Sequence, residues 1–323
     1  MTELDHAIHR MNQWGGAGKP FFFLFDFDLQ KPIVLPLDET ADADILISMP
    51  NYANVVERIN PSTPILEHDG YDLDCYASQF QTIMNHLRAG DSFLVNLTCQ
   101  TPVRLNLPFD RLFESVRAKY KLLFKNQFLV FSPETFVQIH QGEISSCPMK
   151  GTLDASLPNA MQQLLDNPKE KAEHSTIVDL IRNDLSVVAT NVQVKRFRYI
   201  EEISAGKGRL LQASSEITGI LPVDYPSRIG DILVSLLPAG SVTGAPKKRT
   251  VEIIRETEIY DRGYYTGIFG IFDGINLDSA VSIRFMENTP NGVVYKSGGG
   301  ITAQSVMKQE YDEMIQKIYV PLH

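Results

Sequence analysis

The chain has 323 residues, of which 43% are hydrophobic and 21% are charged, and its formal net charge is -9 at neutral pH. This composition predicts a globular protein with a large core, and it excludes a fibrous or disordered chain. Because an acidic surface repels phosphate groups, neither nucleic acid nor an anionic membrane is an expected partner.

Cysteine usage and the N-terminus predict a cytoplasmic protein. Cys75, Cys99 and Cys147 are widely spaced and form neither a CxxC metal motif nor a paired framework. An odd, scattered set is typical of a reducing compartment. The N-terminus lacks the basic region of a signal peptide, and the longest apolar run, residues 21–25, is far shorter than a membrane span.

We expect residues 1–70 to form a short N-terminal region packed on a core made of residues 71–323. In the first part, the spacing of apolar residues predicts a helix over 1–14 and a hairpin of strands over 21–28 and 33–36. The aromatic run in that hairpin is assigned to the core.

Periodicity and turn residues predict the remaining elements. Helices are expected over 71–88, 108–120, 168–183, 225–236, 246–257 and 303–319, and residues 154–167 form a polar connection without a clear period. Strands are expected over 92–98, 127–131, 187–196 and 210–218, and a meander over 267–272, 279–285 and 293–297.

Residues 132–152 carry one acid and one amine around a predicted hairpin. Residues 135–140 alternate, Gln141-Gly142 is a turn signal, and 143–147 return. The hairpin would bring Glu134 and Lys150 to the same place, which suits a reaction that needs a proton donor and a nucleophile. A solvated ion pair across the strands explains the same spacing.

Two predicted helices each present carboxylates on one face. Glu170 and Glu173 are three residues apart, as are Glu310 and Glu313, with Lys317 one turn further on. Oxygen ligands from two facing helices suit a hard cation, and Mg²⁺ is preferred to Zn²⁺ because no Cys or His cluster accompanies them. Two solvated acidic faces are the alternative.

Glycine-rich segments in the second half are candidate anion sites. "PAGSVTGAPKKR" (238–249) opens a helix, whose N-terminal N–H groups can bind an anion, but it lacks the spacing of a Walker phosphate loop. "SGGGIT" (297–302) permits close approach of backbone to a ligand. Arg284 in "SIR" can hold a carboxylate with two hydrogen bonds.

The pair "SPETF … PMKGT" resembles the "SPERF … PIKGT" pair of the chorismate-utilising enzymes. The resemblance runs from about residue 71 to the C-terminus through motifs in the family's order. Lys150 in the second motif resembles component I of the aminodeoxychorismate synthases, whereas anthranilate synthases usually have alanine there. The first 70 residues are hard to match, and no tryptophan site is predicted in them.

The resemblance implies an α/β (α+β) fold, a sandwich of two mostly antiparallel sheets with outer helices. It also implies the site. Lys150 would be the nucleophile and Glu134 the general acid. Glu173 and Glu313 would bind Mg²⁺, with Glu170 and Glu310 close by. Substrate contacts would come from Thr152, Gly240, Ser241, Thr243, Gly244, Tyr265, Arg284, Gly298, Gly299, Gly300 and Lys317.

The implied reaction is a transfer of ammonia to chorismate, which gives 4-amino-4-deoxychorismate for para-aminobenzoate and folate synthesis. Because the chain shows no glutaminase triad, a separate glutamine amidotransferase subunit would supply ammonia from glutamine. Two residues depart from the family pattern: Leu94 replaces the usual Gln, and Phe285 replaces a Thr. Leu94 argues against water addition, which needs a base. Anthranilate synthase and a non-catalytic chorismate-binding paralogue are the alternatives.

Overall fold

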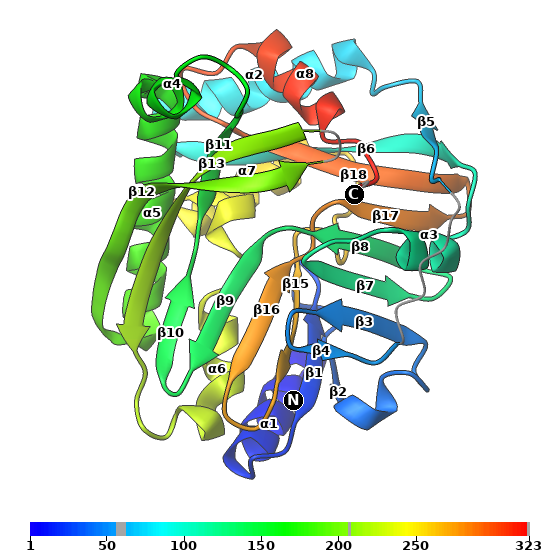
Figure 1. The fold of residues 1–323 in the computed structure, drawn as a ribbon, viewed down its shortest axis with the longest axis vertical. Coiled ribbons are helices and arrows are strands. Elements are labelled where there is room, and N and C mark those ends of the chain that lie inside the picture. Colours follow the sequence, from blue (N-terminus) through cyan, green and yellow to red (C-terminus); the bar gives the residue numbers. More distant parts are fainter. Residues whose placement is uncertain (56–62, 206–207, 322–323) are drawn as a thin grey trace.

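The computed structural model describes residues 1–55, 63–205 and 208–321. Within these ranges the strands form two nine-stranded sheets, in which all pairings are antiparallel. Helices lie outside the sheets (Figure 1). The predicted sandwich of antiparallel sheets with outer helices is therefore confirmed.

The first sheet carries the predicted hairpin near one edge. Its strand order is β11 (Met149–Asp154), β13 (Gly208–Ile220), β10 (Glu143–Ser146), β9 (Thr135–His140), β16 (Leu277–Val281), β15 (Ile268–Phe272), β1 (Phe21–Phe25) and β2 (Ile33–Pro36), and β12 (Thr190–Ala205) also pairs with β13.

The second sheet carries the C-terminal glycine run at its centre. Its order is β14 (Gly244–Ala245), β6 (Leu94–Leu105), β18 (Gly292–Ile301), β17 (Phe285–Thr289), β8 (Phe128–Ser132), β7 (Tyr120–Phe124), β3 (Ile45–Met49) and β4 (Tyr52–Ala53), and β5 (Leu66–His68) pairs with β6. Strands from the first 70 residues thus belong to both sheets.

The helices cover the outer faces of the two sheets. They are α1 (Glu3–Gly16), α2 (Leu73–Ala89), α3 (Phe109–Ser115), α4 (Ala160–Asp166), α5 (Pro168–Val188), α6 (Ile229–Ser235), α7 (Lys247–Thr257) and α8 (Met307–Gln316). Helix α5 lies along β12 and β13, while α2 and α8 lie over β6 and β18 (Figure 1). The two acidic helices predicted from the sequence, α5 and α8, therefore belong to different sheets.

Strand β1 explains why an unbroken aromatic run belongs to the core. Phe21, Phe23 and Phe25 pack in the cluster beneath α1, α5 and α6, whereas Phe22 and Leu24 pack in the cluster between the two sheets. A strand buried on both faces needs no alternation of polar residues. Each of the five residues is fully buried, as predicted.

The chain crosses from the first sheet to the second at residues 282–284. Strand β16 ends at Val281 in the first sheet, and β17 begins at Phe285 in the second. The prediction of one continuous strand over 279–285 in a meander was therefore wrong. Arg284 has a positive φ of 54° at this crossing, which breaks the extended backbone.

Two further element predictions were wrong. The helix expected over 108–120 ends at Ser115, and Tyr120 begins strand β7. The connection expected to lack structure over 154–167 contains the short helix α4. Its N-cap, Asn159, is a residue type that favours this position, but it has a left-handed backbone and makes no side-chain cap hydrogen bond.

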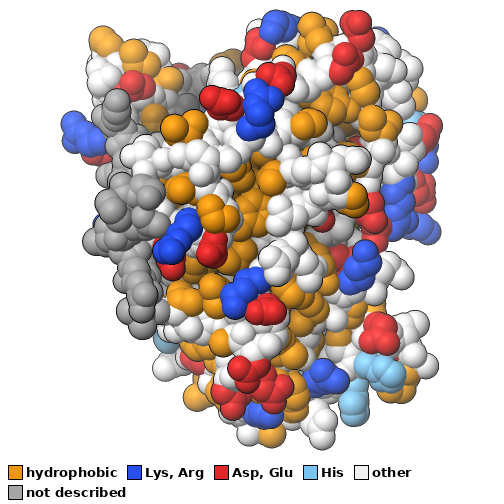
Figure 2. All heavy atoms as spheres, turned by 90° about the vertical axis from the view of Figure 1, so that its right-hand side faces the viewer, with side chains coloured by type: hydrophobic (Ala, Val, Ile, Leu, Met, Phe, Trp, Pro, Cys, Tyr) orange, Lys and Arg blue, Asp and Glu red, His pale blue; other side chains and the backbone are white. Residues whose placement is uncertain are grey.

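The surface on the side of α3 and β5 carries basic and acidic side chains interspersed with hydrophobic ones (Figure 2). This face does not present a continuous basic surface. Among the described residues, none of the helices combines the length and apolar character needed to cross a bilayer.

Candidate functional site

Glu134 lies at the entrance to the hairpin of β9 and β10. The turn has positive φ at Gln141 (49°) and Gly142 (87°), as the sequence predicted for a tight hairpin. At the other end, the backbone N–H of Glu134 donates to Ser132 Oγ at 3.1 Å and its carbonyl accepts from Val281 N at 3.1 Å. Bonds to two neighbouring strands fix the backbone of this residue.

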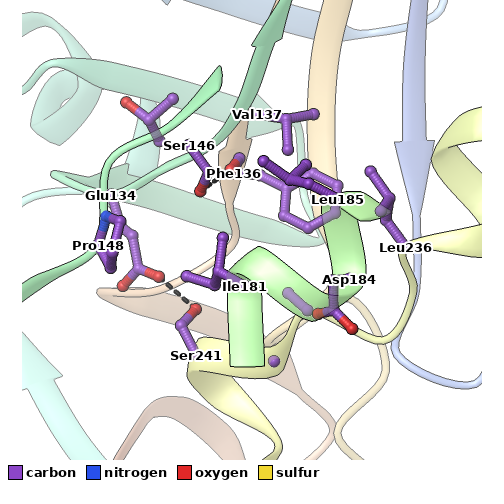
Figure 3. Close-up of a pocket in the computed structure, with 13 residues that line it drawn as sticks. Glu134, Phe136, Val137, Ser146, Pro148, Ile181, Asp184, Leu185, Leu236 and Ser241 are labelled. Atoms are coloured by element: carbon purple, nitrogen blue, oxygen red, sulfur yellow. Dashed lines mark hydrogen bonds between the residues drawn. The ribbon is translucent and has the colours of Figure 1, made fainter. Parts of the chain in front are cut away.

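A recess opens beside the Glu134 carboxylate (Figure 3). Glu134 and Ser241 lie at one end, where the Ser241 hydroxyl donates to Glu134 Oε1, and Asp184 lies toward the other (Figure 3). The walls are mostly apolar. They come from Phe136, Val137, Pro148, Ile181, Leu185, Leu236 and Ala239, with Thr135, Ser146 and Gly240 completing the lining.

The second half of the predicted pair, Lys150, lies on strand β11. Pro148 shares the recess with Glu134, and Lys150 is paired through its backbone with Ala213 of β13. The ladder shifts between Lys150 and Thr152, where Gly151 has a φ of 75°. The hairpin thus brings the backbone segment that carries Lys150 close to Glu134. The side chains of Lys150 and Thr152 lie outside the described residues.

Glu170 lies directly against this glycine. A Cβ at Gly151 would be 2.8 Å from Glu170 Oε2, next to the start of α5, and the positive φ of this residue favours glycine. His174, one turn further along α5, is buried, and its Nε2 lies 2.6 Å from Ser215 Oγ on β13. His174 is therefore a packed histidine.

The loop of residues 238–246 closes the recess from the other side. Gly240 packs against α5, since a Cβ there would be 2.7 Å from Leu180 Cδ2. The Thr243 hydroxyl donates to the carbonyl of Ala239 at 2.8 Å, inside the loop. Gly244 has a φ of 127°, and a Cβ there would lie 1.9 Å from the carbonyl oxygen of Leu94. Of the loop residues predicted to bind substrate, Ser241 is the one whose side chain reaches Glu134.

An ion pair that the sequence did not predict anchors the start of α7. Lys247 Nζ lies 2.8 Å from Asp184 Oδ2 and donates to the carbonyl of Leu236 at 2.7 Å. Burial raises the pKa of Asp184, while Lys247 opposes that shift.

Arg284 lies among tyrosines at the crossing between the sheets. Its guanidinium is 5.2 Å from the ring centroid of Tyr319, and its buried Nε has no hydrogen-bond partner within the described residues. Tyr265 is 3% exposed and packs with Phe285 in the core between the sheets. A buried guanidinium with unused donor capacity is chemically suited to a carboxylate. The Phe285 ring stacks on Phe128 at 4.9 Å, which accounts for an aromatic residue at this position.

The glycine run on β18 meets the last helix. Lys317 Nζ donates to the carbonyl of Gly298 at 2.9 Å, and a Cβ at Gly299 would lie 3.6 Å from the same nitrogen. Gly300 is covered by Leu94, whose Cδ1 would be 2.9 Å from a Cβ there. Leu94, in place of the family's usual Gln, is therefore a packing residue.

The four predicted metal-binding glutamates occupy different surroundings. Glu310 is 4% exposed, whereas the Glu313 side chain is 55% exposed and pairs with Lys317 at 2.8 Å. Within the described residues, no group of three or more Asp, Glu, His or Cys side chains is placed to hold a metal ion. Mg²⁺ commonly uses only one or two protein carboxylates and completes its shell with substrate and water, so the magnesium site that the motifs imply stays a prediction.

Glu258 and Arg262 form a buried pair that was not predicted from the sequence. Each side chain is 2% exposed, and Arg262 Nη2 lies 2.6 Å from Glu258 Oε1. Their spacing of four residues was the available signal, but the same spacing is common in solvated surface pairs.

Comparison with known proteins assigns the family. The model of the chorismate binding enzyme family matches residues 38–323, so the chain belongs to this family of chorismate-utilising enzymes, as its motifs predicted. An uncharacterized PabA-like protein from Pasteurella multocida is 48% identical over 320 residues, which are 98% of this chain and 99% of that protein.

Named synthases are more distant. Aminodeoxychorismate synthase component 1 from Klebsiella aerogenes is 34% identical over 264 residues, covering 77% of this chain but 57% of that enzyme. The structure of anthranilate synthase component I from Streptococcus pneumoniae matches with a TM-score of 0.68 and 26% identity over 84% of this chain and 61% of that one. The menaquinone-specific isochorismate synthase of Escherichia coli matches with a TM-score of 0.72 at 18% identity, over 98% of this chain and 81% of that one, and supports the fold alone.

Proposed function

We propose that the protein is an aminodeoxychorismate synthase component I, which converts chorismate and ammonia into 4-amino-4-deoxychorismate and water. The proposal rests on one observation: Glu134 and Pro148 line the same recess. Lys150 follows Pro148 by two residues, so the segment that carries this amine lies beside the acid. An acid and an amine in that arrangement can share one substrate. The named relative from Klebsiella aerogenes supports this reading.

The reaction divides into two displacements. In the first, the neutral Lys150 amine forms a bond to C2 of chorismate, both ring double bonds shift by one position, and the C4–O bond breaks. Glu134 gives its proton to the departing hydroxyl, which leaves as water. In the second, ammonia bonds to C4, both double bonds shift back, and the lysine amine leaves C2. Glu134 regains a proton from the nitrogen that was added, so atoms and charge balance.

An internal amine is useful because direct displacement at C4 would require ammonia to expel a poor leaving group in one step. Covalent catalysis splits that step into two easier ones. An ordinary lysine has a pKa of about 10.4, so roughly one amine in a few thousand is neutral at pH 7. The reaction with free ammonium is therefore expected to accelerate as the pH rises.

Two separate regions are proposed to hold the two substrate carboxylates. Arg284, with its unpartnered Nε, would bind one directly. Mg²⁺, held by Glu173 and Glu313, would neutralise the other when bound. Gly299, whose open side faces Lys317 and Glu313, would allow the ring to approach the backbone of β18.

The source of ammonia is proposed to be a glutamine amidotransferase partner. The test of the whole proposal is incubation of the purified chain with chorismate, Mg²⁺ and ammonium at high pH, with product identification by mass spectrometry and a 4-amino-4-deoxychorismate standard. Addition of glutamine alone should give no product, and addition of a glutamine amidotransferase subunit should restore it.

Anthranilate synthase is the second candidate. A relative from Aquifex aeolicus named anthranilate synthase component 1 is 36% identical over 195 residues, which are 58% of this chain and 38% of that enzyme. Lysine at position 150 favours C4 amination instead, because the anthranilate synthases usually have alanine there. The same incubation separates the two functions, since anthranilate is fluorescent and carries its amine at the former C2.

A further inference from the structure

We propose that Arg262 is a positioning residue for Glu134: it holds the loop from which Ser241 donates to the Glu134 carboxylate, and Glu258 keeps Arg262 in place. Arg262 and Glu258 are remote in sequence from both Ser241 and Glu134. The kinetic part of this inference rests on the proposed function, because it takes Glu134 as the proton donor.

The Arg262 guanidinium uses all of its donors. Nε and Nη2 donate to the two oxygens of Glu258 at 2.8 and 2.6 Å. The remaining three N–H groups donate to Val242 O at 2.9 Å, to Thr266 Oγ1 at 3.2 Å and to Asn96 O at 2.7 Å. Five donors in a rigid planar fork, each with a partner, define one position for this side chain.

Glu258 is held just as fully. Beyond Arg262, its Oε1 accepts from the backbone N–H of Thr98 at 2.9 Å and from the Thr98 hydroxyl at 2.7 Å. Both members of the pair are buried, and a buried charge is tolerated only when it is paired and hydrogen-bonded. The pair is therefore fastened to strand β6 through Thr98 and Asn96.

This anchor reaches the loop next to Ser241. Val242, whose carbonyl Arg262 holds, follows Ser241 directly, and Asn96 N also donates to the carbonyl of Thr243 at 2.8 Å. The two bonds fix consecutive peptide groups of the loop against β6. Only a fixed loop can present the Ser241 hydroxyl at a constant distance from the Glu134 carboxylate, and loss of that position by about 1 Å can reduce turnover roughly 10²-fold.

Arg262 would make the same contacts if it only stabilised the fold. The test must therefore separate a positioning role from a purely structural one. Arg262→Lys keeps a positive charge beside Glu258 but cannot make the five bonds of the fork. The variants are Arg262→Lys, Ser241→Ala, the double variant, and Ser241→Thr, which retains a hydroxyl. Arg10→Lys is the matched control, because Arg10 donates to a main-chain carbonyl, that of Val34 at 3.1 Å, in the distant corner of α1 and β2.

For the proposal we expect Arg262→Lys and Ser241→Ala each to lower kcat by about 10- to 10²-fold while KM for chorismate changes by less than about threefold. The double variant should be no slower than Ser241→Ala within about twofold, because Arg262 acts through Ser241. Ser241→Thr should recover most of the turnover, and Arg10→Lys should match the wild type. The proposal would be overturned if the reductions in kcat of the two single variants multiplied in the double variant. It would also be overturned if Arg262→Lys lowered the melting temperature but left kcat unchanged.

Hydrogen exchange of the loop peptides gives a readout that does not depend on the reaction. Amides of residues 238–246 should exchange faster in Arg262→Lys than in the wild type and in Arg10→Lys. If the wild type makes no aminated product, the proposed function fails, and unchanged exchange would still refute the positioning role. If Arg262→Lys does not fold, Glu258→Gln, which keeps the shape but not the charge of the anchor, takes its place in both measurements with the same expected directions.

Discussion

Lys317 forms an ion pair with Glu313 one helical turn earlier, and the same amine donates to the carbonyl of Gly298. The contact joins the last helix to the glycine run of β18. Two motifs that the sequence presents separately, the acidic helix face and the glycines, therefore meet at one place. The Glu313 carboxylate at this junction can contact a substrate that lies against the glycine backbone of β18.

This junction leads to a prediction about magnesium. Glu313→Gln and Glu173→Gln should each lower turnover by about 10²-fold or more, because each removes one of the negative charges that would hold the cation. The measurement is turnover as a function of Mg²⁺ concentration, together with calorimetric Mg²⁺ binding in the presence of chorismate.

Asp312→Asn is the control for the magnesium experiment, since Asp312 lies on the same helix and pairs with Lys308 at the surface. It should leave both the activity and the Mg²⁺ titration unchanged. Full activity of the wild type in excess EDTA would rule out the metal requirement.

The second prediction concerns Glu134 as the proton donor. Glu134→Gln should reduce kcat by roughly 10²- to 10⁴-fold, the usual effect of losing a positioned general acid, while the fold persists. Glu143→Gln, at the opposite end of the same hairpin and 44% exposed, should behave as the wild type. Equal rates for Glu134→Gln and the wild type would assign the proton to another group.

Local patterns predicted the elements around this site, and tertiary contacts decided the rest. The hairpin turn at Gln141-Gly142 and the end of helix α2 at Gly90 both need a backbone with positive φ. The residue types at these positions therefore signal them. The passage of the chain between sheets at Arg284 depends on which partner strands are available, and no period in the sequence encodes that choice.

The same distinction applies to the site residues. Glu134 and the Lys150 segment could be placed together because one hairpin connects them. The link from Arg262 to Ser241 runs through main-chain carbonyls, which every residue carries, so the sequence holds no trace of it. The hydroxyl of Thr243, which the sequence predicts to contact substrate, donates to the carbonyl of Ala239 within the loop.

The third prediction is a pH dependence of stability that originates at Asp184. Burial raises the pKa of this carboxyl, with Lys247 opposing, so the folded protein retains the proton at pH values where the unfolded chain, with a value near 3.8, has lost it. The stability contributed by this group is thus fully present below about pH 3.8 and is lost as the pH rises through the folded value.

Asp184→Asn removes this titration. The measurement is the unfolding free energy of wild type and variant, from urea denaturation at pH 4 to 7. As the pH rises, the wild type should lose stability relative to the variant. Asp179→Asn, on the same helix and 72% exposed, should show no such trend. A difference independent of pH would contradict the raised pKa.

The last prediction is that Lys150 bonds covalently to the substrate. Pro148 and Gly151 flank the lysine, and Gly151 has a φ of 75°, a conformation that fixes where the strand turns beside the recess. Lys150→Ala and Lys150→Arg should both lose formation of aminodeoxychorismate, the second because a guanidinium stays protonated and cannot attack. Lys195→Ala, at a half-exposed lysine on β12, should retain it.

The covalent bond itself can be observed without turnover. With chorismate and Mg²⁺ but no ammonia, the second displacement cannot occur, so the adduct should accumulate on the wild type. Intact-protein mass spectrometry should show the added mass, and digestion should locate it on the peptide that contains Lys150. Lys150→Ala should show no adduct, and a small yield of product aminated at C2 is expected from it instead. An alanine variant that makes aminodeoxychorismate at the wild-type rate would exclude Lys150 as the nucleophile.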